Sequence, residues 1–509
     1  MIDAGQFILS KEKYSRPDFE CLRLRDGYYL SFHKKLRVYT HCQYPVLLLG
    51  IAWQAGKDRQ DPVCELEMLA EKWKGQIPER EILAMEETWC GRYVLIVGEN
   101  VYLDATGLLG VFYGGGAVSS SLRLLAEYMR LPERLFEPSG DINWLPGPFT
   151  QYDSIRRLLP SQIYGYCSGV VRPRELRASL RTEKWSEEER ISLFVDTFRF
   201  SLSNLRRAVP GKEILIALTG GYDSRTLLSL AKDAKLRFSS FTLEHDRMPE
   251  GDVGIPQELS EIAGCPYFYI FRKKENFRRE WEDEYTRHTL NLADDGDKSH
   301  YAHGQYQELV QRFGEVVILR SSVWEVAIDY LEKVTGSERS PENLCEYYNL
   351  PKQSLEHRSL EAYFQWAAGA GMQEMSAANQ FFWEQRYGSW MSSIEQSFDL
   401  MDGVVSLHPV NSRFFLSLLM DFPKEERLVR MHQVKIMARA CPELAKVRFS
   451  GNRLAGSGPL SELWEKCRQG LQRLRKYGFR KTFCIYRDLL RRHLQMHRTR
   501  KEKEKELGI

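Results

Sequence analysis

A polar loop that follows a short apolar run holds the residues of this chain best suited to chemistry. The loop reads Thr219-Gly220-Gly221-Tyr222-Asp223-Ser224 and comes directly after the apolar residues 214–218. The apolar run predicts a strand, and the leucines at 227, 228 and 230 predict a helix that begins near Arg225. A strand, a glycine turn and a helix N-terminus form an anion site, because backbone N–H groups and the helix dipole both face the ligand.

Each residue type in this loop suits a phosphate group. Gly220 and Gly221 let the backbone approach a phosphate, the hydroxyls of Thr219 and Ser224 can donate to it, and Asp223 can hold a divalent cation beside it. The alternative is an ordinary strand-to-helix turn in which the glycines only allow the backbone to turn and bind no ligand. The order of hydroxyl, Gly, Gly, any residue, Asp and Ser favours the phosphate site. It differs from a Walker A loop, which requires Gly-x-x-x-x-Gly-Lys-Ser/Thr.

This loop resembles the Ser-Gly-Gly-x-Asp-Ser signature of the asparagine synthetase family, within the PP-loop ATP pyrophosphatases, with Thr219 in place of the first serine. The resemblance implies that residues from Leu218 to Ser224 hold the pyrophosphate part of ATP, with Mg²⁺ at Asp223. It also implies the reaction: an ATP-dependent, AMP-forming ligase that adenylates a carboxylate and transfers it to an amine. The same chemistry within one molecule would make a cyclase, as in the similar β-lactam synthetases and lasso-peptide cyclases.

The residues around the loop alternate between strand and helix patterns. Strands are expected at 214–218, 238–243 and 267–271, with helices up to 234 and around 256–263. This order predicts an α/β fold with a parallel sheet that binds its ligand at the carboxyl ends of the strands. In the family the second strand cradles the adenine, so the resemblance implies nucleotide contacts at Phe241 and Thr242. Asp252, ahead of the next helix, is ambiguous: it could belong to the site, although a helix cap is the commoner explanation.

The strand expected at 316–319 is followed by a segment that lacks two acidic residues found in asparagine synthetases. Synthetases have Gly-Glu-Gly-x-Asp-Glu here; Glu325 matches the last Glu, whereas Ser321 and Trp324 stand where the family has a catalytic Glu and a magnesium-binding Asp. Magnesium would then be held by Asp223, phosphate oxygens and water, or by a compensating acidic loop at 294–297, for which plain solvation is the simpler interpretation. Glu325 is expected either in the site or as a structural carboxylate.

A later basic motif also resembles the family. Lys435 matches the synthetase Lys-x-x-Leu-Arg motif in order and spacing, which implies a lysine that neutralises charge on the α-phosphate. The alternative is an exposed helix lysine. Arg386 and Arg413 are candidates to pair with a substrate carboxylate or with buried acids.

The first part of the chain is rich in strand patterns. Strands are expected at 28–32, 44–51, 92–97, 101–104 and 105–113. The segments 91–96 and 103–113 together resemble the glutaminase half of asparagine synthetases, which implies a four-layer α-β-β-α (Ntn-hydrolase-like) domain. That half needs a cysteine exposed after the initiator Met, and position 2 is Ile2, so we expect no glutaminase activity. The expected domains are a degenerate amidotransferase-like domain at 1–185, a PP-loop ATP-binding domain at 186–460 and a basic helical tail at 461–509.

Composition narrows the class of protein. The 509 residues carry a net charge of +3 and are 43% hydrophobic. No segment reaches 18 uninterrupted apolar residues, so we expect no membrane span. Ten scattered cysteines indicate reduced thiols in a cytoplasmic protein. Residues 466–509 hold 15 Lys and Arg against 4 Asp and Glu, and we interpret them as solvated helix faces rather than a nucleic-acid surface. The expected partners are carboxylate and amine substrates; a homodimer is left open.

Two other functions remain open from the sequence. One is adenylation followed by sulfur transfer, which the absence of paired cysteines disfavours. The other is a catalytically degenerate nucleotide-binding scaffold or partner protein, which Ser321 and Trp324 keep open. The identities of the acid and the amine are not encoded in any recognisable motif.

Overall fold

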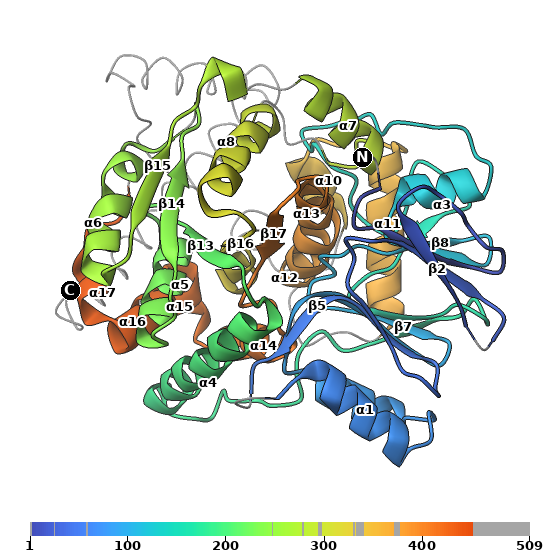
Figure 1. Ribbon diagram of the computed structural model, residues 1–509, viewed down its shortest axis with the longest axis horizontal. Coiled ribbons are helices and arrows are strands. Elements are labelled where there is room, and N and C mark those ends of the chain that lie inside the picture. Colours follow the sequence, from blue (N-terminus) through green and yellow to red (C-terminus); the bar gives the residue numbers. More distant parts are fainter. Residues whose placement is uncertain are drawn as a thin grey trace.

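The computed structural model describes residues 3–450, apart from 25, 57–59, 247, 277–278, 294–297, 329–330, 332–340 and 371–376. Within the described residues the chain forms two antiparallel sheets of six strands each and one parallel sheet of five. Figure 1 shows the antiparallel sheets on one side of the molecule and the parallel sheet on the other. The predicted acidic loop at 294–297 and the predicted tail at 461–509 lie outside the described residues.

The N-terminal part is a sandwich of two sheets between helices. The sheet orders are β10-β8-β9-β1-β3-β2 and β12-β11-β7-β6-β5-β4. Helix α3 packs on the outer face of the first sheet, and α1 and α2 pack on that of the second. This arrangement gives the four layers α-β-β-α that were predicted. The strands are β1 (Phe7–Ser10), β2 (Phe19–Arg23), β3 (Tyr29–His33), β4 (Val38–Thr40), β5 (Val46–Gln54), β6 (Trp89–Val97), β7 (Asn100–Leu103), β8 (Phe112–Gly114), β9 (Ala117–Ser119), β10 (Arg156–Arg157), β11 (Gln162–Gly165) and β12 (Val171–Pro173); the helices are α1 (Pro62–Lys72), α2 (Glu79–Glu86) and α3 (Leu122–Tyr128).

Strand β6 shows why apolar residues follow one another almost without interruption in the strands of the N-terminal part, instead of alternating with polar ones. All nine of its residues are buried. Val94 and Ile96 point into the core between the two sheets, whereas Tyr93 and Leu95 point to the helices on the other face. Successive side chains of a strand point to opposite faces, so a strand covered on both faces is apolar throughout.

Over 105–113 a strand entered through a glycine turn was predicted; the turn is longer and the strand shorter than expected. Only β8, from Phe112, is a strand, and residues 105–110 form turns. The carboxylate of buried Asp104 accepts hydrogen bonds from the N–H groups of Thr106, Gly107 and Leu108. An Asp side chain that satisfies three successive amides stabilises a turn in place of a strand.

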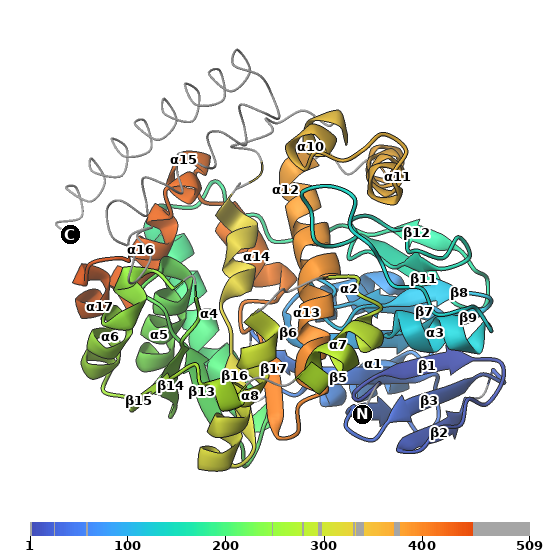
Figure 2. The same ribbon diagram turned by 90° about the horizontal axis from the view of Figure 1, so that it is seen from above.

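The parallel sheet has the order β15-β14-β13-β16-β17, which confirms the predicted α/β fold class. Helices α4, α5, α6, α16 and α17 lie on one side of this sheet and α8 on the other (Figure 2). The chain leaves β13 toward β14 on one side and returns to β16 on the other, so the order reverses between β13 and β16. The strands are β13 (Glu213–Ala217), β14 (Ser239–Leu243), β15 (Tyr267–Ile270), β16 (Val316–Leu319) and β17 (Val404–Leu407). The helices around them are α4 (Glu187–Ala208), α5 (Tyr222–Asp233), η1 (Glu250–Val253), α6 (Ile255–Ala263), η2 (Lys274–Asn276), α7 (Arg279–Thr289), α8 (Lys298–Phe313) and η3 (Ser322–Ile328).

Further helices connect the two halves. A continuous helical stretch through α12, η4 and α13 stands between the sandwich and the parallel sheet (Figure 2). Trp383 of η4 donates to the carbonyl of Ala105 at 2.7 Å, and Arg92 of β6 forms an ion pair with Asp399 of α13 at 2.7 Å. The domain division at 185 stays a prediction. These helices are α10 (Pro341–Tyr347), α11 (Leu355–Gly369), α12 (Ala377–Phe381), the π-helix η4 (Phe382–Met391), α13 (Ser392–Asp399), α14 (Arg413–Met420), α15 (Lys424–Leu428), α16 (Met431–Ala440) and α17 (Pro442–Lys446).

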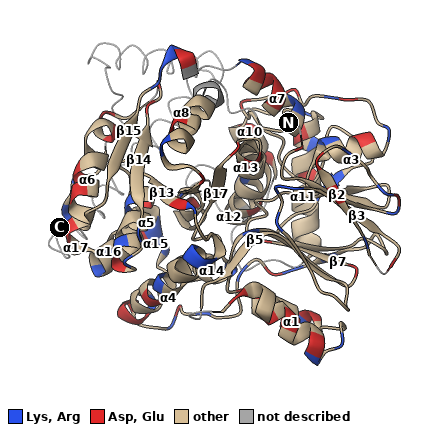
Figure 3. Cartoon of the chain, viewed as in Figure 1, with Lys and Arg blue, Asp and Glu red and all other residues tan. Residues whose placement is uncertain are grey.

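Charged residues gather on outward helices such as α1, α4 and α6, whereas the strands of all three sheets carry few of them (Figure 3). Across the described ranges, no helix combines the length and the apolar character that crossing a membrane requires.

Candidate active site

A cavity of about 870 Å³ opens at the carboxyl ends of the parallel strands. Its walls come from the loop after β13, the end of β14, the segment after β16 and the π-helix η4. The cavity therefore lies where the strand order reverses between β13 and β16, the place where open parallel sheets bind their ligands. The π-helical turn is uncommon, and such turns are frequent at functional sites.

The predicted phosphate loop forms the floor of this cavity. Leu218, Thr219, Gly221, Asp223 and Ser224 all line it. Gly221 caps the N-terminus of α5, and no side chain caps it. The Thr219 and Ser224 hydroxyls lie 3.0 Å apart, and Ser224 Oγ also accepts from the Thr219 N–H at 3.0 Å. An N-terminus without a side-chain cap, next to paired hydroxyls, can receive an anion.

Gly220 lies beneath this floor and is not among the lining residues. A Cβ added to it would stand 2.9 Å from Ser450 Cβ and 3.0 Å from Asp252 Oδ1. Its N–H donates to Asp252 Oδ1 at 2.7 Å. Gly220 therefore serves close packing of the loop against its neighbours.

Asp252 is not the helix cap that the sequence suggested. Helix α6 begins after Gly254 without a side-chain cap, and Asp252 lies in η1 with its carboxylate on the phosphate loop. Burial raises the pKa of this carboxyl, although the Gly220 N–H opposes the shift. Asp252 holds the loop in place and lines the cavity beside it.

Phe241 and Thr242 both line the cavity at the end of β14. The Thr242 hydroxyl donates to the carbonyl of Leu218 at 2.7 Å and so ties this strand to the phosphate loop. The Phe241 ring meets Tyr306 edge to face, with centroids 6.2 Å apart. An aromatic wall next to a phosphate floor suits a nucleotide, because the base and the phosphates need different surroundings.

Asp223 and Glu325 meet across the cavity, with Arg430 between them. Arg430 Nη1 donates to Asp223 Oδ1 at 2.7 Å, and its Nη2 lies 3.9 Å from Glu325 Oε1. Gln433 Nε2 also donates to Asp223 Oδ1 at 2.7 Å. Burial and the charge of Asp223 raise the pKa of Glu325, whereas Arg430 opposes the shift. The sequence did not single out Arg430 or Gln433.

The structure does not bring Lys435 to the cavity. Its ammonium forms ion pairs with Glu187 and with Glu426, the second at 3.0 Å, and Lys435 is not among the lining residues. The side chains that reach Asp223 from this part of the chain are Gln433 on helix α16 and Arg430, just before its first turn.

Arg413 and Arg386, the two candidates to bind a substrate carboxylate, differ in their partners in the structure. Buried Arg413 pairs with a buried acid, as one of the two predicted alternatives has it: its Nε lies 3.5 Å from Glu86 Oε1. It also donates to the backbone carbonyls of Pro160, Glu175 and Leu176. Arg386 lines the cavity from η4 and stacks on Trp390, with its guanidinium carbon 3.5 Å from the ring centroid. Among the described residues Arg386 has no hydrogen-bond or ion-pair partner, so its charge is available to an anion.

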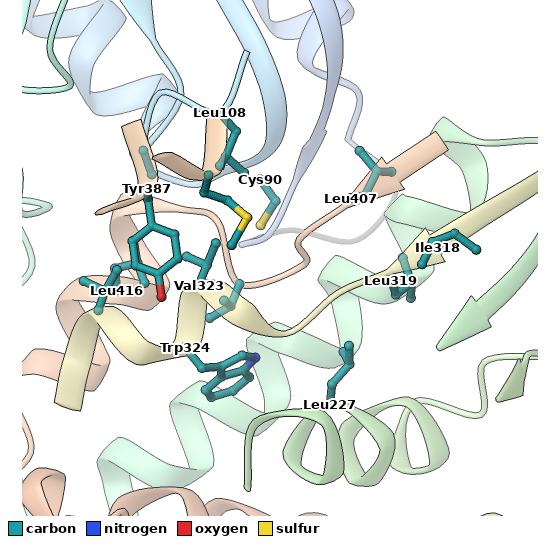
Figure 4. Packing of buried hydrophobic residues seen from close by; sticks show 14 of the residues in the cluster. Cys90, Leu108, Leu227, Ile318, Leu319, Val323, Trp324, Tyr387, Leu407 and Leu416 are labelled. Atoms are coloured by element: carbon teal, nitrogen blue, oxygen red, sulfur yellow. The ribbon is translucent and has the colours of Figure 1, made fainter. Parts of the chain in front are cut away.

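Trp324, at the position of the family's magnesium-binding Asp, is a core residue. Figure 4 shows it pointing away from the strand ends, toward α4. It is fully buried and packs against Phe194 at 5.5 Å and Phe198 at 6.1 Å between ring centroids. An acid here would be buried without a partner, so this position cannot restore the family's metal ligand.

Replacing Trp324 tests this packing. We expect Trp324→Ala to lower the free energy of unfolding by ~3–5 kcal/mol, the usual cost of removing a buried aromatic ring. Trp324→Phe, which keeps a ring in the same space, should cost clearly less. Urea unfolding measures both, and a Trp324→Ala protein as stable as the wild type would place this side chain outside the core.

The residues at hand do not fit a metal ion held by the protein alone. In the described part of the chain, no group of three or more His, Cys, Asp or Glu side chains is arranged so that it could hold a metal ion. The two carboxylates that face each other, Asp223 and Glu325, already share the guanidinium of Arg430.

Comparisons with known proteins do not assign this chain to a family. No protein-family model matches it, and no curated protein matches it. Among solved structures it is similar to NMN synthetase from Francisella tularensis, with 15% identity over 39% of this chain and 93% of that chain, at a TM-score of 0.21. It is also similar to the U34-tRNA thiolase from Methanococcus maripaludis with its 4Fe-4S cluster, with 10% identity over 59% of this chain and 80% of that chain, at a TM-score of 0.22. Both TM-scores are too low for the similarity to carry an argument.

Proposed function

We propose that this protein binds ATP in the cavity at the ends of β13 and β16 and adenylates a carboxylate, which then passes to an amine. The observation that supports this most is the α5 N-terminus without a side-chain cap, next to the Thr219 and Ser224 hydroxyls, on the floor of the cavity. The same cavity holds Arg386, which has no hydrogen-bond or ion-pair partner within the part of the chain that the structure describes. A phosphate site and a carboxylate site in one cavity are what an acid-activating enzyme needs.

The reaction assigns a role to each part of the cavity. The loop from Leu218 to Ser224 holds the β- and γ-phosphates, and Phe241 and Thr242 border the adenosine. Arg386 holds the acid near the α-phosphate, so that a carboxylate oxygen attacks phosphorus and pyrophosphate leaves. An amine then attacks the acyl-adenylate and AMP leaves. Glu325, whose pKa is raised, takes the proton that the attacking amine loses.

Magnesium enters this proposal as part of the Mg·ATP complex and supplies charge neutralisation on the phosphates. Asp223 is the chain's own contact for it. Lys435 has no part in the proposal, because its charge is shared by two glutamates away from the cavity.

The second candidate is a nucleotide-binding scaffold without catalysis. Two observations favour it: Ser321 stands at the position of a catalytic acid, and Trp324 is buried in the core at the position of a metal ligand.

ATP–pyrophosphate exchange separates the two candidates. Labelled pyrophosphate is incubated with the protein, Mg·ATP and pools of carboxylic acids. We expect label to enter ATP only with an acid that the protein activates, because adenylation is reversible before the amine arrives. A protein that binds ATP and exchanges label with no pool of acids would be the scaffold.

A further inference from the structure

Arg430 occupies an unusual position for an arginine. Its backbone is left-handed, with φ 61° and ψ 19°, directly before α16. A residue with a Cβ reaches this conformation at a cost, so the surrounding structure must hold it there. The side chain extends to Asp223, which lines the cavity, and 26% of its surface stays exposed.

The guanidinium is surrounded by partners that fix it. Asp223 Oδ1 accepts at 2.7 Å, Glu325 Oε1 lies 3.9 Å away, and the Tyr222 ring lies 5.6 Å from the guanidinium carbon. Gln433 donates to the same oxygen of Asp223. That oxygen therefore already accepts two donors, one of them charged.

We infer that Arg430 is the resident cation of the Asp223–Glu325 pair, and that a divalent metal ion reaches this pair only together with a nucleotide. The inference rests on the proposed function in one respect, that the cavity is taken as the nucleotide site. In the free protein a metal ion would have to displace a guanidinium that neutralises both carboxylates. The phosphates of an incoming Mg·ATP complex offer Arg430 an alternative partner, so metal and guanidinium can exchange there.

The ion pairs of Arg430 also determine whether the protein binds a metal ion when no nucleotide is present. Without Arg430, Asp223 would keep only the neutral donor Gln433. Glu325 would keep the Tyr387 hydroxyl and the charge of Arg386. The guanidinium that the two carboxylates share would be gone, and two carboxylates with room for water can bind a hard cation. Removal of the guanidinium should therefore create a metal site that the wild-type protein does not offer.

Titration of the full-length protein with Mn²⁺ alone, followed by electron paramagnetic resonance of the free ion, tests this. Arg430→Gly is the main variant, because glycine adopts the left-handed backbone without cost. We expect it to bind Mn²⁺ at least tenfold more tightly than the wild type, and we expect Asp223→Asn in that background to remove the gain. Arg430→Lys, which keeps a cation, should resemble the wild type.

Gln433→Leu is the matched control, because it removes a neutral donor to the same carboxylate oxygen and should create no metal site. Wild-type protein that binds Mn²⁺ as tightly as Arg430→Gly, or a folded Arg430→Gly that gains nothing, would overturn the inference. If Arg430→Gly does not fold, Mn²⁺ binding by the wild type that Asp223→Asn abolishes overturns it equally. Failure to bind ATP would overturn the proposed function, and with it the entry of a metal ion together with a nucleotide. It would leave standing the result that Arg430 keeps a metal ion from the Asp223–Glu325 pair in the free protein.

Discussion

Asp223→Ala is expected to lower acid-dependent pyrophosphate release by at least about 100-fold, which corresponds to ~2.7 kcal/mol in the activation barrier. The carboxylate of Asp223 has two tasks in our account. It holds Arg430 and Gln433 in the free protein, and it meets the metal ion that arrives with ATP. The variant loses both at once. The measurement is pyrophosphate release with an acid identified by the exchange assay.

The matched control lies on the same helix. Asp233 ends α5, and its ion pair with Arg199 on the surface is of a kind that contributes ~0–1 kcal/mol. Asp233→Ala should release pyrophosphate at the wild-type rate. The fold should survive in both variants, because neither side chain is part of the apolar core, and circular dichroism checks this. An Asp223→Ala protein that turns over normally would remove Asp223 from the reaction.

Arg386→Gln is expected to raise the KM for the acid about 10- to 150-fold, while ATP binding stays unchanged. A charge-assisted hydrogen bond contributes ~1.5–3 kcal/mol, and Arg386 is the cavity arginine without a partner of its own among the described residues. Its stacking on Trp390 holds the guanidinium plane in one orientation, which favours a carboxylate that binds through both oxygens.

Arg312 offers a control with the same stacking. Its guanidinium carbon lies 4.7 Å from the centroid of the Phe268 ring, but Arg312 is exposed on α8 and is not among the residues that line the cavity. Arg312→Gln should leave both KM values unchanged. If Arg386→Gln instead weakens ATP binding and leaves the KM for the acid as it was, then Arg386 contacts the nucleotide and the acid binds elsewhere.

The fold around the cavity could be predicted from local patterns. Residues 214–218 and 238–243 are short apolar runs bounded by turn residues, and the helices between them carry leucines at helical spacing, so β13, α5 and β14 were found within a few residues. Strand β17 was not predicted. Its four residues, Val404–Leu407, form a run too short to distinguish from loop, and only pairing with β16 makes them a strand.

The site was predicted where one segment holds all its parts and missed where distant segments meet. The loop from Thr219 to Ser224 carries its chemistry in consecutive residues. Arg430 is about 200 residues further along the chain, and nothing next to it indicates that its side chain turns back to Asp223. Lys435 shows the reverse case: the sequence placed it in the site by its motif spacing, but in the structure it forms ion pairs with two glutamates, one of them on α4. Sequence patterns record local structure, whereas such pairings depend on the tertiary fold.

Calorimetric titration with Mg·ATP of the wild type, Gly221→Ala and Gly254→Ala tests the central claim most directly. Both glycines cap the N-terminus of a helix without a side-chain cap, and neither has a left-handed backbone. A Cβ at Gly221 would stand 3.3 Å from Thr219 Oγ1, on the cavity floor, whereas a Cβ at Gly254 would meet nothing within 4 Å. We predict that the wild type and Gly254→Ala bind ATP alike and that Gly221→Ala binds it at least tenfold more weakly, a loss of ~1.4 kcal/mol. Equal binding by all three proteins, or binding by none, would contradict a nucleotide site at this loop.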